Sequence, residues 1–164
     1  MRLGNGAIVA ALSVAFLVIS VGVGASFYYD NVYNVDRANA WVDLAAADNN
    51  LTQVLADLNE SLALLAPYHG NPNPLFPQPR TNFDLIKQQI EATVASGEVV
   101  VHESPDNFSY QQALKNIQSD LTTTLYGEIN DTATAMLWWG FLMWDFLSLV
   151  LLAVGSFFLF ILRE

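Results

Sequence analysis

The chain of 164 residues contains no cysteine. This absence excludes disulfide bonds, thiolate metal sites, iron–sulfur clusters and haem attached through cysteine. The sequence also lacks a glycine-rich phosphate loop and a serine-nucleophile motif, so we expect no cofactor. The folded part must therefore be held together by the packing of its side chains.

Basic residues are scarce as well. Six Lys and Arg stand against 16 Asp and Glu, which gives a formal net charge of −10. The middle segment, residues 28–134, carries four of the bases and 14 of the acids, so the whole net charge lies there. Such a surface repels phosphates, and nucleic acid is excluded as a partner. The acidity is typical of a solvated acidic surface or of adaptation to high salt.

Only two histidines are present, His69 and His102. His102 is close in sequence to Glu103 and Asp106, but neither histidine has a second one at the spacing of metal ligands. We therefore expect no metal site. The middle segment is also too short for a deep cleft with a lid, so we expect no enzyme and no small-molecule substrate.

Long apolar runs lie near the two ends of the chain. Residues 7–27 carry no charge, and 21 residues at about 1.5 Å each reach the roughly 30 Å of a hydrocarbon core. Residues 135–162 form the second run. We expect both to be transmembrane helices. A cleaved signal peptide is the alternative for the first run, since Arg2 precedes it and Val23-Gly24-Ala25 is typical of a cleavage site.

The flanking charges predict the orientation of these spans. Arg2 and Arg163 place residues 1–6 and 163–164 in the cytoplasm, and the acidic segment 28–134 becomes extracellular or periplasmic. Aromatic residues at the outer ends of both spans are typical of belts at the membrane surface: Tyr28, Tyr29, Trp138, Trp139 and Trp144. We therefore expect a two-pass protein of the cell membrane.

Four sequons lie in the middle segment and agree with an outside location. One or two are expected by chance in a chain this rich in Asn, Ser and Thr, so some need not be modified. The predicted N-glycosylation sites of this glycoprotein are Asn50, Asn59, Asn107 and Asn130.

Apolar spacing predicts three helices in the middle segment, at about 36–66, 82–96 and 110–130. The first carries a single stripe, broken only by Asp48, through Trp41, Leu44, Leu51, Leu55, Leu58, Leu62 and Leu65. The second begins at Thr81 and ends at Gly97, with Phe83, Ile86, Ile90 and Val94 on one face. The third begins at Ser109 and continues into the second span, with a stripe through Leu114, Ile117, Leu121, Leu125 and Glu128 or Ile129.

Five prolines between Pro67 and Pro79 exclude a helix there and predict an outer loop. Such a loop either caps a bundle or contacts a partner. The expected fold is an all-α membrane protein, in which two antiparallel transmembrane helices continue into a small extracellular helical bundle with a proline-rich outer loop.

Two features of the expected spans indicate contacts. Asp145 lies near the outer boundary of the second span, and it is either an interfacial acid or, with Ser148 and Ser156 on the same face, a polar contact to another subunit. Small residues on the first span form a stripe that lets another helix approach closely: Ala11, Ala15, Gly22 and Ser26.

No stretch of the chain matches a known family residue by residue. The pattern favours a non-catalytic accessory or structural subunit of a larger membrane protein complex. Its expected partners are the lipid bilayer and other integral membrane subunits, in a homo- or hetero-oligomer. Two alternatives remain open: the sensory or adhesive ectodomain of a two-span receptor without its own cytoplasmic output domain, and a viral envelope protein.

Overall fold

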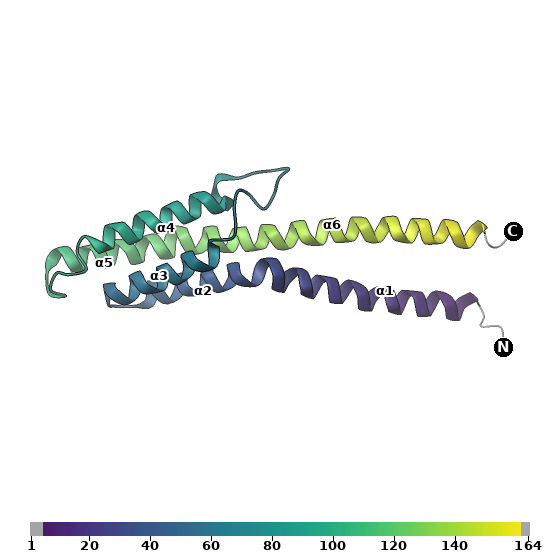
Figure 1. Cartoon of the computed structure of the whole chain (residues 1–164), viewed down its shortest axis with the longest axis horizontal. Helices are drawn as coiled ribbons and strands as arrows, with labels where there is room; N and C mark the ends of the chain where they lie inside the picture. Colours follow the sequence, from purple (N-terminus) through teal and green to yellow (C-terminus); the bar gives the residue numbers. More distant parts are fainter. Residues whose placement is uncertain (1–4, 162–164) are drawn as a thin grey trace.

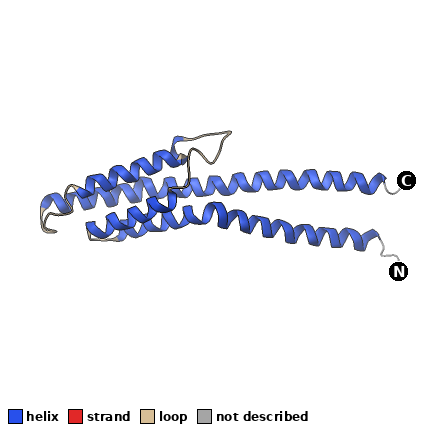
Figure 2. Ribbon diagram, in the orientation of Figure 1, coloured by secondary structure: helices blue, strands red, loops and turns tan. Residues whose placement is uncertain are grey.

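The structure of the protein is a computed structural model. It describes the backbone of residues 5–161 and the side chains of residues 14–15, 18–141, 143–144, 146, 148 and 150. Every regular element in this part of the chain is helical, and none of it is strand (Figure 2). The all-helical character of the expected fold is therefore confirmed for these residues.

Six α-helices follow one another along the described backbone: α1 (Asn5–Phe27), α2 (Tyr33–Ala47), α3 (Leu51–Leu65), α4 (Phe83–Glu98), α5 (Phe108–Asp120) and α6 (Tyr126–Ile161). Two wide π-helical turns, η1 (Tyr28–Val32) and η3 (Leu121–Leu125), join α1 to α2 and α5 to α6. A short 3-10 turn, η2 (Pro79–Thr81), precedes α4. Figure 1 shows two long helical rods, with α3 and α4 packed at the end far from the termini.

No helix in the described part of the chain is both long enough and apolar enough to cross a lipid bilayer. The transmembrane helices expected at 7–27 and 135–162 are therefore wrong. The predicted membrane fold class is therefore wrong as well. The same holds for the two-pass location in the cell membrane, the cytoplasmic ends and the outside placement of 28–134.

A span needs about 20 consecutive apolar residues with few charges. The start of α6 does not meet this condition, because it carries the charged residues Glu128 and Asp131.

The single helix expected over 36–66 is in fact an antiparallel pair, α2 and α3. At Asp48 the backbone becomes extended, with φ −74° and ψ 143°, and α2 ends. Asn50 then caps α3, because its side chain accepts a hydrogen bond from the Thr52 N–H at 2.9 Å. The short polar side chains of Asp48, Asn49 and Asn50 favour such a break over a continuous helix.

Each helix of this pair has its own core-facing stripe. The buried apolar residues of α2 are Val35, Ala38, Val42 and Ala45, and those of α3 include Leu51, Val54, Leu58 and Leu65. Leu44, expected on the common stripe with Trp41, is 53% exposed. The stripe prediction was wrong for α2 because the chain reverses between the two helices, so one periodic pattern does not run through both.

The apolar face predicted for α4 is buried, at Phe83, Ile86, Ile90 and Val94. The start of the helix differs from the prediction: Asn82 is the cap, and its Oδ1 accepts hydrogen bonds from the N–H groups of Asp84 and Leu85 at 2.9 and 3.3 Å. The helix ends at Glu98, one residue beyond the predicted Gly97. Leu55 of α3 packs against Gly97, and a Cβ there would be 2.6 Å from Leu55 Cδ2.

The stripe predicted across α5 and the start of α6 is also buried, at Leu114, Ile117, Leu121, Leu125 and Ile129. Four-residue steps in an ideal α-helix drift by about 40° each around the axis. The wide turn η3 rotates the chain less per residue and so offsets this drift. Leu121, Leu125 and Ile129 therefore all face α2 and the core. Helix α5 is capped by Asn107, whose side chain accepts a hydrogen bond from the Ser109 N–H at 2.9 Å.

Candidate functional site

The proline-rich loop, residues 66–82, is fixed to the start of α4. Gly70 adopts a positive φ of 64°, and its carbonyl accepts from the Phe83 N–H at 2.8 Å. The Gly70 N–H donates to Asp84 Oδ2 at 2.9 Å, while His69 Nδ1 and Lys87 Nζ lie 3.2 and 3.3 Å from Asp84 Oδ1. The Gly70 hydrogen bond, then that of His69, lowers the pKa of Asp84.

Two asparagines shape the interior of this loop. Asn71 Nδ2 donates to the Gln78 carbonyl at 2.6 Å and to Thr81 Oγ1 at 3.0 Å. Asn73 Oδ1 accepts from the N–H groups of Leu75 and Phe76 at 3.1 and 3.0 Å. Asn side chains that bond to nearby backbone produce defined bends. The bend leaves Leu75 and Phe76 at the tip, 65% and 70% exposed.

An ion pair ties the far end of the loop to α6. The Arg80 Nη2 atom lies 3.0 Å from Asp131 Oδ2, and the two side chains are 65% and 49% exposed. An ion pair this open to solvent contributes about 0–1 kcal/mol to stability. Its structural effect is to hold the loop beside α6.

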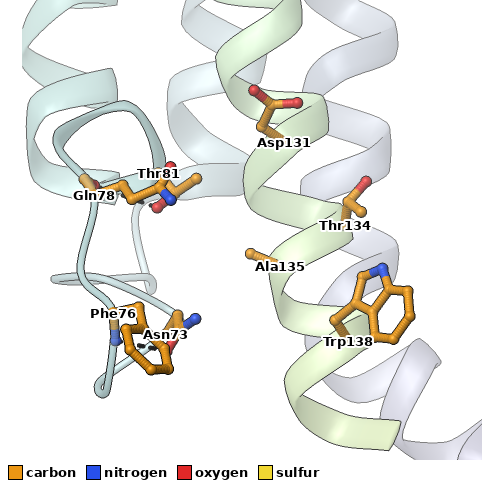
Figure 3. Close-up of a pocket in the computed structure, with 8 residues that line it drawn as sticks. All are labelled: Asn73, Phe76, Gln78, Thr81, Asp131, Thr134, Ala135 and Trp138. Carbon is orange, nitrogen blue, oxygen red and sulfur yellow. Dashed lines mark hydrogen bonds between the residues drawn. The ribbon is translucent and has the colours of Figure 1, made fainter.

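A groove of about 220 Å³ lies between the loop and α6. The loop contributes Asn73, Phe76, Gln78 and Thr81, and α6 contributes Asp131, Thr134, Ala135 and Trp138. Figure 3 shows the two groups on opposite sides, with the small Ala135 side chain directed toward the loop. The lining residues therefore include two aromatic residues, several with neutral polar groups and one with a carboxylate. In Figure 3 the Trp138 ring extends to the side of α6 away from the loop.

The groove is acidic. Asp131 is the only ionisable side chain among its described lining residues. Glu128, one turn earlier on α6, is partly buried, and this burial raises its pKa; Arg80 opposes the effect, whereas Asp120 and Asp131 add to it. Arg80 thus pairs with Asp131 and also acts on Glu128.

A second hollow, of about 560 Å³, lies where α3 meets the end of α4 and is lined by Thr52, Leu55, Glu98, Val101 and His102. Glu103 Oε2 is buried without a hydrogen-bond partner in the described structure. Among the described residues, no group of three His, Cys, Asp or Glu side chains is close enough to hold a metal ion. The structure therefore does not gather His102, Glu103 and Asp106 into a metal centre.

The predicted helix-packing seam is only partly within the described residues. Ala11 lies outside them, and Ala15, Gly22 and Ser26 are exposed. A Cβ on Gly22 would have no described atom within 4 Å, and Ser26 Oγ donates to Asp30 Oδ2 at 2.9 Å within its own rod. The seam stays a prediction, because the structure sets no other described helix against these residues.

The polar face predicted on α6 is likewise untested. Asp145 and Ser156 lie outside the described side chains, and Ser148 Oγ donates to the Trp144 carbonyl at 2.8 Å within its own helix. The Trp144 indole N–H is buried and has no hydrogen-bond partner in the described structure. A contact between this face and another chain remains a prediction.

The predicted aromatic belts depended on the two spans corrected above. Tyr28 is partly buried and donates to Asp36 Oδ2 at 2.7 Å, and this bond raises the Tyr28 pKa. Tyr29 and Trp138 are exposed, whereas Trp139 is partly buried, as is Trp144. These aromatics thus differ in their exposure.

All four predicted glycosylation sites are exposed. Asn50 and Asn107 cap helices α3 and α5. Asn59 lies within α3, where its Nδ2 donates to the Leu55 carbonyl at 2.9 Å, and Asn130 lies on α6. Their modification stays a prediction.

Sequence reasoning identified the loop but missed its contact with α6. Arg80 and Asp131 are 51 positions apart, and neither belongs to a motif that points to the other. No protein-family model, no curated protein and no solved structure matches this chain.

Proposed function

We propose that this protein is a non-catalytic accessory subunit, and that α1 and α6 pack against apolar helices of a larger protein assembly. One observation carries the proposal: both helices expose many large apolar side chains. Large exposed fractions include those of Val14, Val18 and Val21 at 64% each, Trp138 at 66%, Phe141 at 57% and Phe146 at 67%. Single exposed apolar residues are common, but a contiguous set of them marks an interaction surface.

The pattern of these residues favours helices as the covering element. Val14, Val18 and Val21 repeat at steps of four and three, and so do Met143, Phe146 and Val150 at steps of three and four. This spacing is that of seams between packed helices. On α1 the neighbours Val18 and Ile19 are both exposed, so more than one face is uncovered. A helix that is apolar on several faces is normally buried inside a larger protein.

The charge distribution favours a partner that differs from this chain. Residues 28–134 carry the entire net charge of −10. Two copies aligned side by side would bring these acidic segments together, and like charges repel. A partner with a neutral or basic surface beside α2–α5 avoids this repulsion.

The proposal is tested on the full chain, purified in mild detergent from cells that produce it naturally. Native mass spectrometry should show a complex of fixed stoichiometry. Phe146→Asp should abolish the complex, whereas the matched control Phe108→Asp should leave it intact, because Phe108 is 79% exposed on α5 rather than on the apolar surface. A clean monomer, or a chain that alone binds lipid vesicles through α1 and α6, would overturn the proposal.

A further inference from the structure

We propose that the groove between the proline-rich loop and α6 binds an arginine side chain of the partner protein. This inference deepens the proposed function and rests on it, since the arginine belongs to the assembly that α1 and α6 join. It is carried by three properties of the groove: its size, its aromatic walls and its local charge.

The size of the groove fits one side chain. Its volume of about 220 Å³ is below the roughly 300–1,000 Å³ typical of pockets for small molecules. Ala135 contributes only a methyl group to the lining, and this group is directed toward the loop in Figure 3. An inserted side chain therefore fits better than a metabolite or cofactor.

The walls suit a planar cation. Phe76 and Trp138 line the groove and are 70% and 66% exposed, so ring surface is available to a ligand. A guanidinium stacks on aromatic faces, and its five N–H groups can reach a carboxylate and neutral acceptors together. An apolar side chain would offer no donor to the remaining acceptor positions of Asp131 or to the side-chain oxygen of Gln78. A lysine ammonium cannot stack as a plane.

The local charge selects a cation. Arg80 occupies Asp131 Oδ2 at 3.0 Å, but a carboxylate offers about four acceptor positions on its two oxygens. Asp131 is half exposed, and Glu128 lies one turn earlier on α6. A second guanidinium can therefore approach Asp131 from the groove, whereas an anionic side chain would be repelled.

The test uses the full chain in mild detergent, labelled with ¹⁵N at tryptophan. Its four tryptophans give four indole N–H signals, and Trp138→Phe assigns that of Trp138. N-acetyl-arginine amide is the probe, and N-acetyl-citrulline amide, which has nearly the same shape without the charge, is its control. The Trp138 signal should shift saturably with arginine, with a dissociation constant in the millimolar range, and not with citrulline. The Trp41 signal should stay in place.

Two matched variants distinguish the effect of the carboxylate on arginine binding from the effect of the loop position. Asp131→Asn and Arg80→Gln break the same ion pair, but only the first removes the proposed acceptor. Asp131→Asn should weaken arginine binding about tenfold or more, whereas Arg80→Gln, which loosens the loop but keeps the carboxylate, should weaken it less. Equal shifts with citrulline, no effect of Asp131→Asn, an equal loss in Arg80→Gln or no shift at all would overturn the inference.

This result is independent of the test of the proposed function, because the probe needs no partner protein. A stable complex without arginine binding would refute only the groove. Arginine binding by a chain that never leaves the monomeric state would refute only the accessory role.

Discussion

The backbone N–H of Leu51 donates a hydrogen bond to the hydroxyl of Tyr110 at 2.8 Å. Leu51 is the first residue of α3, and the first N–H groups of a helix have no partner within it. Both residues are buried, with exposed fractions of 0% and 4%. A side chain from α5 therefore completes the cap of α3, together with Asn50, and joins two helices that are distant in sequence.

Tyr110→Phe should lower the free energy of unfolding by about 1–3 kcal/mol, because it leaves the buried Leu51 N–H without a partner. Urea denaturation followed by circular dichroism measures the change. The matched control is Tyr126→Phe, which removes a hydroxyl that is largely open to solvent, since Tyr126 is 43% exposed. Equal stability of the two variants would show that the hydrogen bond contributes nothing.

The Phe27 ring lies against Gly140 and brings the end of α1 onto α6. A Cβ at position 140 would be 2.6 Å from Phe27 Cζ. Gly140→Ala should therefore destabilise the protein by about 1–3 kcal/mol through overpacking, as measured by chemical denaturation.

Gly127→Ala is the control for this change, because a Cβ there would meet no described atom within 4 Å. It should stabilise α6 by about 0.5–1 kcal/mol, the usual gain when alanine replaces glycine inside a helix. Adding Phe27→Leu to Gly140→Ala should restore part of the lost stability. A Gly140→Ala protein as stable as Gly127→Ala would contradict the observed contact.

Asp57 should make stability depend on pH. Burial raises its pKa above the ordinary value of 3.8, and the nearby carboxylates of Asp48 and Glu60 act in the same direction against the hydrogen bond from Gln53. The contribution of the protonated Asp57 carboxyl group to the free energy of unfolding is therefore fully present below pH 3.8. It is lost as the pH rises through the higher pKa of the folded state.

Asp57→Asn should consequently be more stable than the natural chain at pH 7, and this advantage should disappear near pH 4 and below. Thermal denaturation between pH 4 and pH 8 measures it. Asp106→Asn, a change in an exposed connector, serves as the control. A natural chain whose stability does not fall relative to Asp57→Asn as the pH rises would disprove the role of this carboxyl group.

The ion pair between Arg80 and Asp131 should hold the loop without adding much global stability. Arg80→Gln should cost no more than about 1 kcal/mol, since both side chains are largely exposed. Backbone hydrogen exchange in residues 71–78 should accelerate, whereas exchange in α3 should not. A double-mutant cycle with Asp131→Asn tests whether the effect belongs to this pair, and it should shrink at high salt.

The loop and the helical stripes show where sequence reasoning succeeds. Pro67 to Pro79 excluded a helix on local grounds, and the spacing of Ile86, Ile90 and Val94 identified the buried face of α4. Sequence reasoning fails at Asp48 to Asn50. The pattern predicts one continuous apolar stripe that only Asp48 interrupts, whereas these residues form a turn between two helices. Local polarity there outweighed the helical periodicity that continued on both sides.

The candidate site could not be found in the same way. Trp138 was identified as an aromatic residue at a membrane surface, but its place in a groove depends on Phe76, on a loop remote in sequence. Arg80 and Asp131 are ordinary surface residues until the fold brings them to 3.0 Å. Contacts between remote segments follow from packing, which no local pattern records.

The sequence by itself determined that this chain is helical, acidic in its middle segment and without cysteine, because apolar spacing, proline positions and charge are local properties. The tertiary structure decided how the chain reverses at Asp48, how Tyr110 caps α3, and how the loop meets α6 at Asp131. These outcomes depend on which helices bury which faces together, and that balance is set only when the whole chain packs.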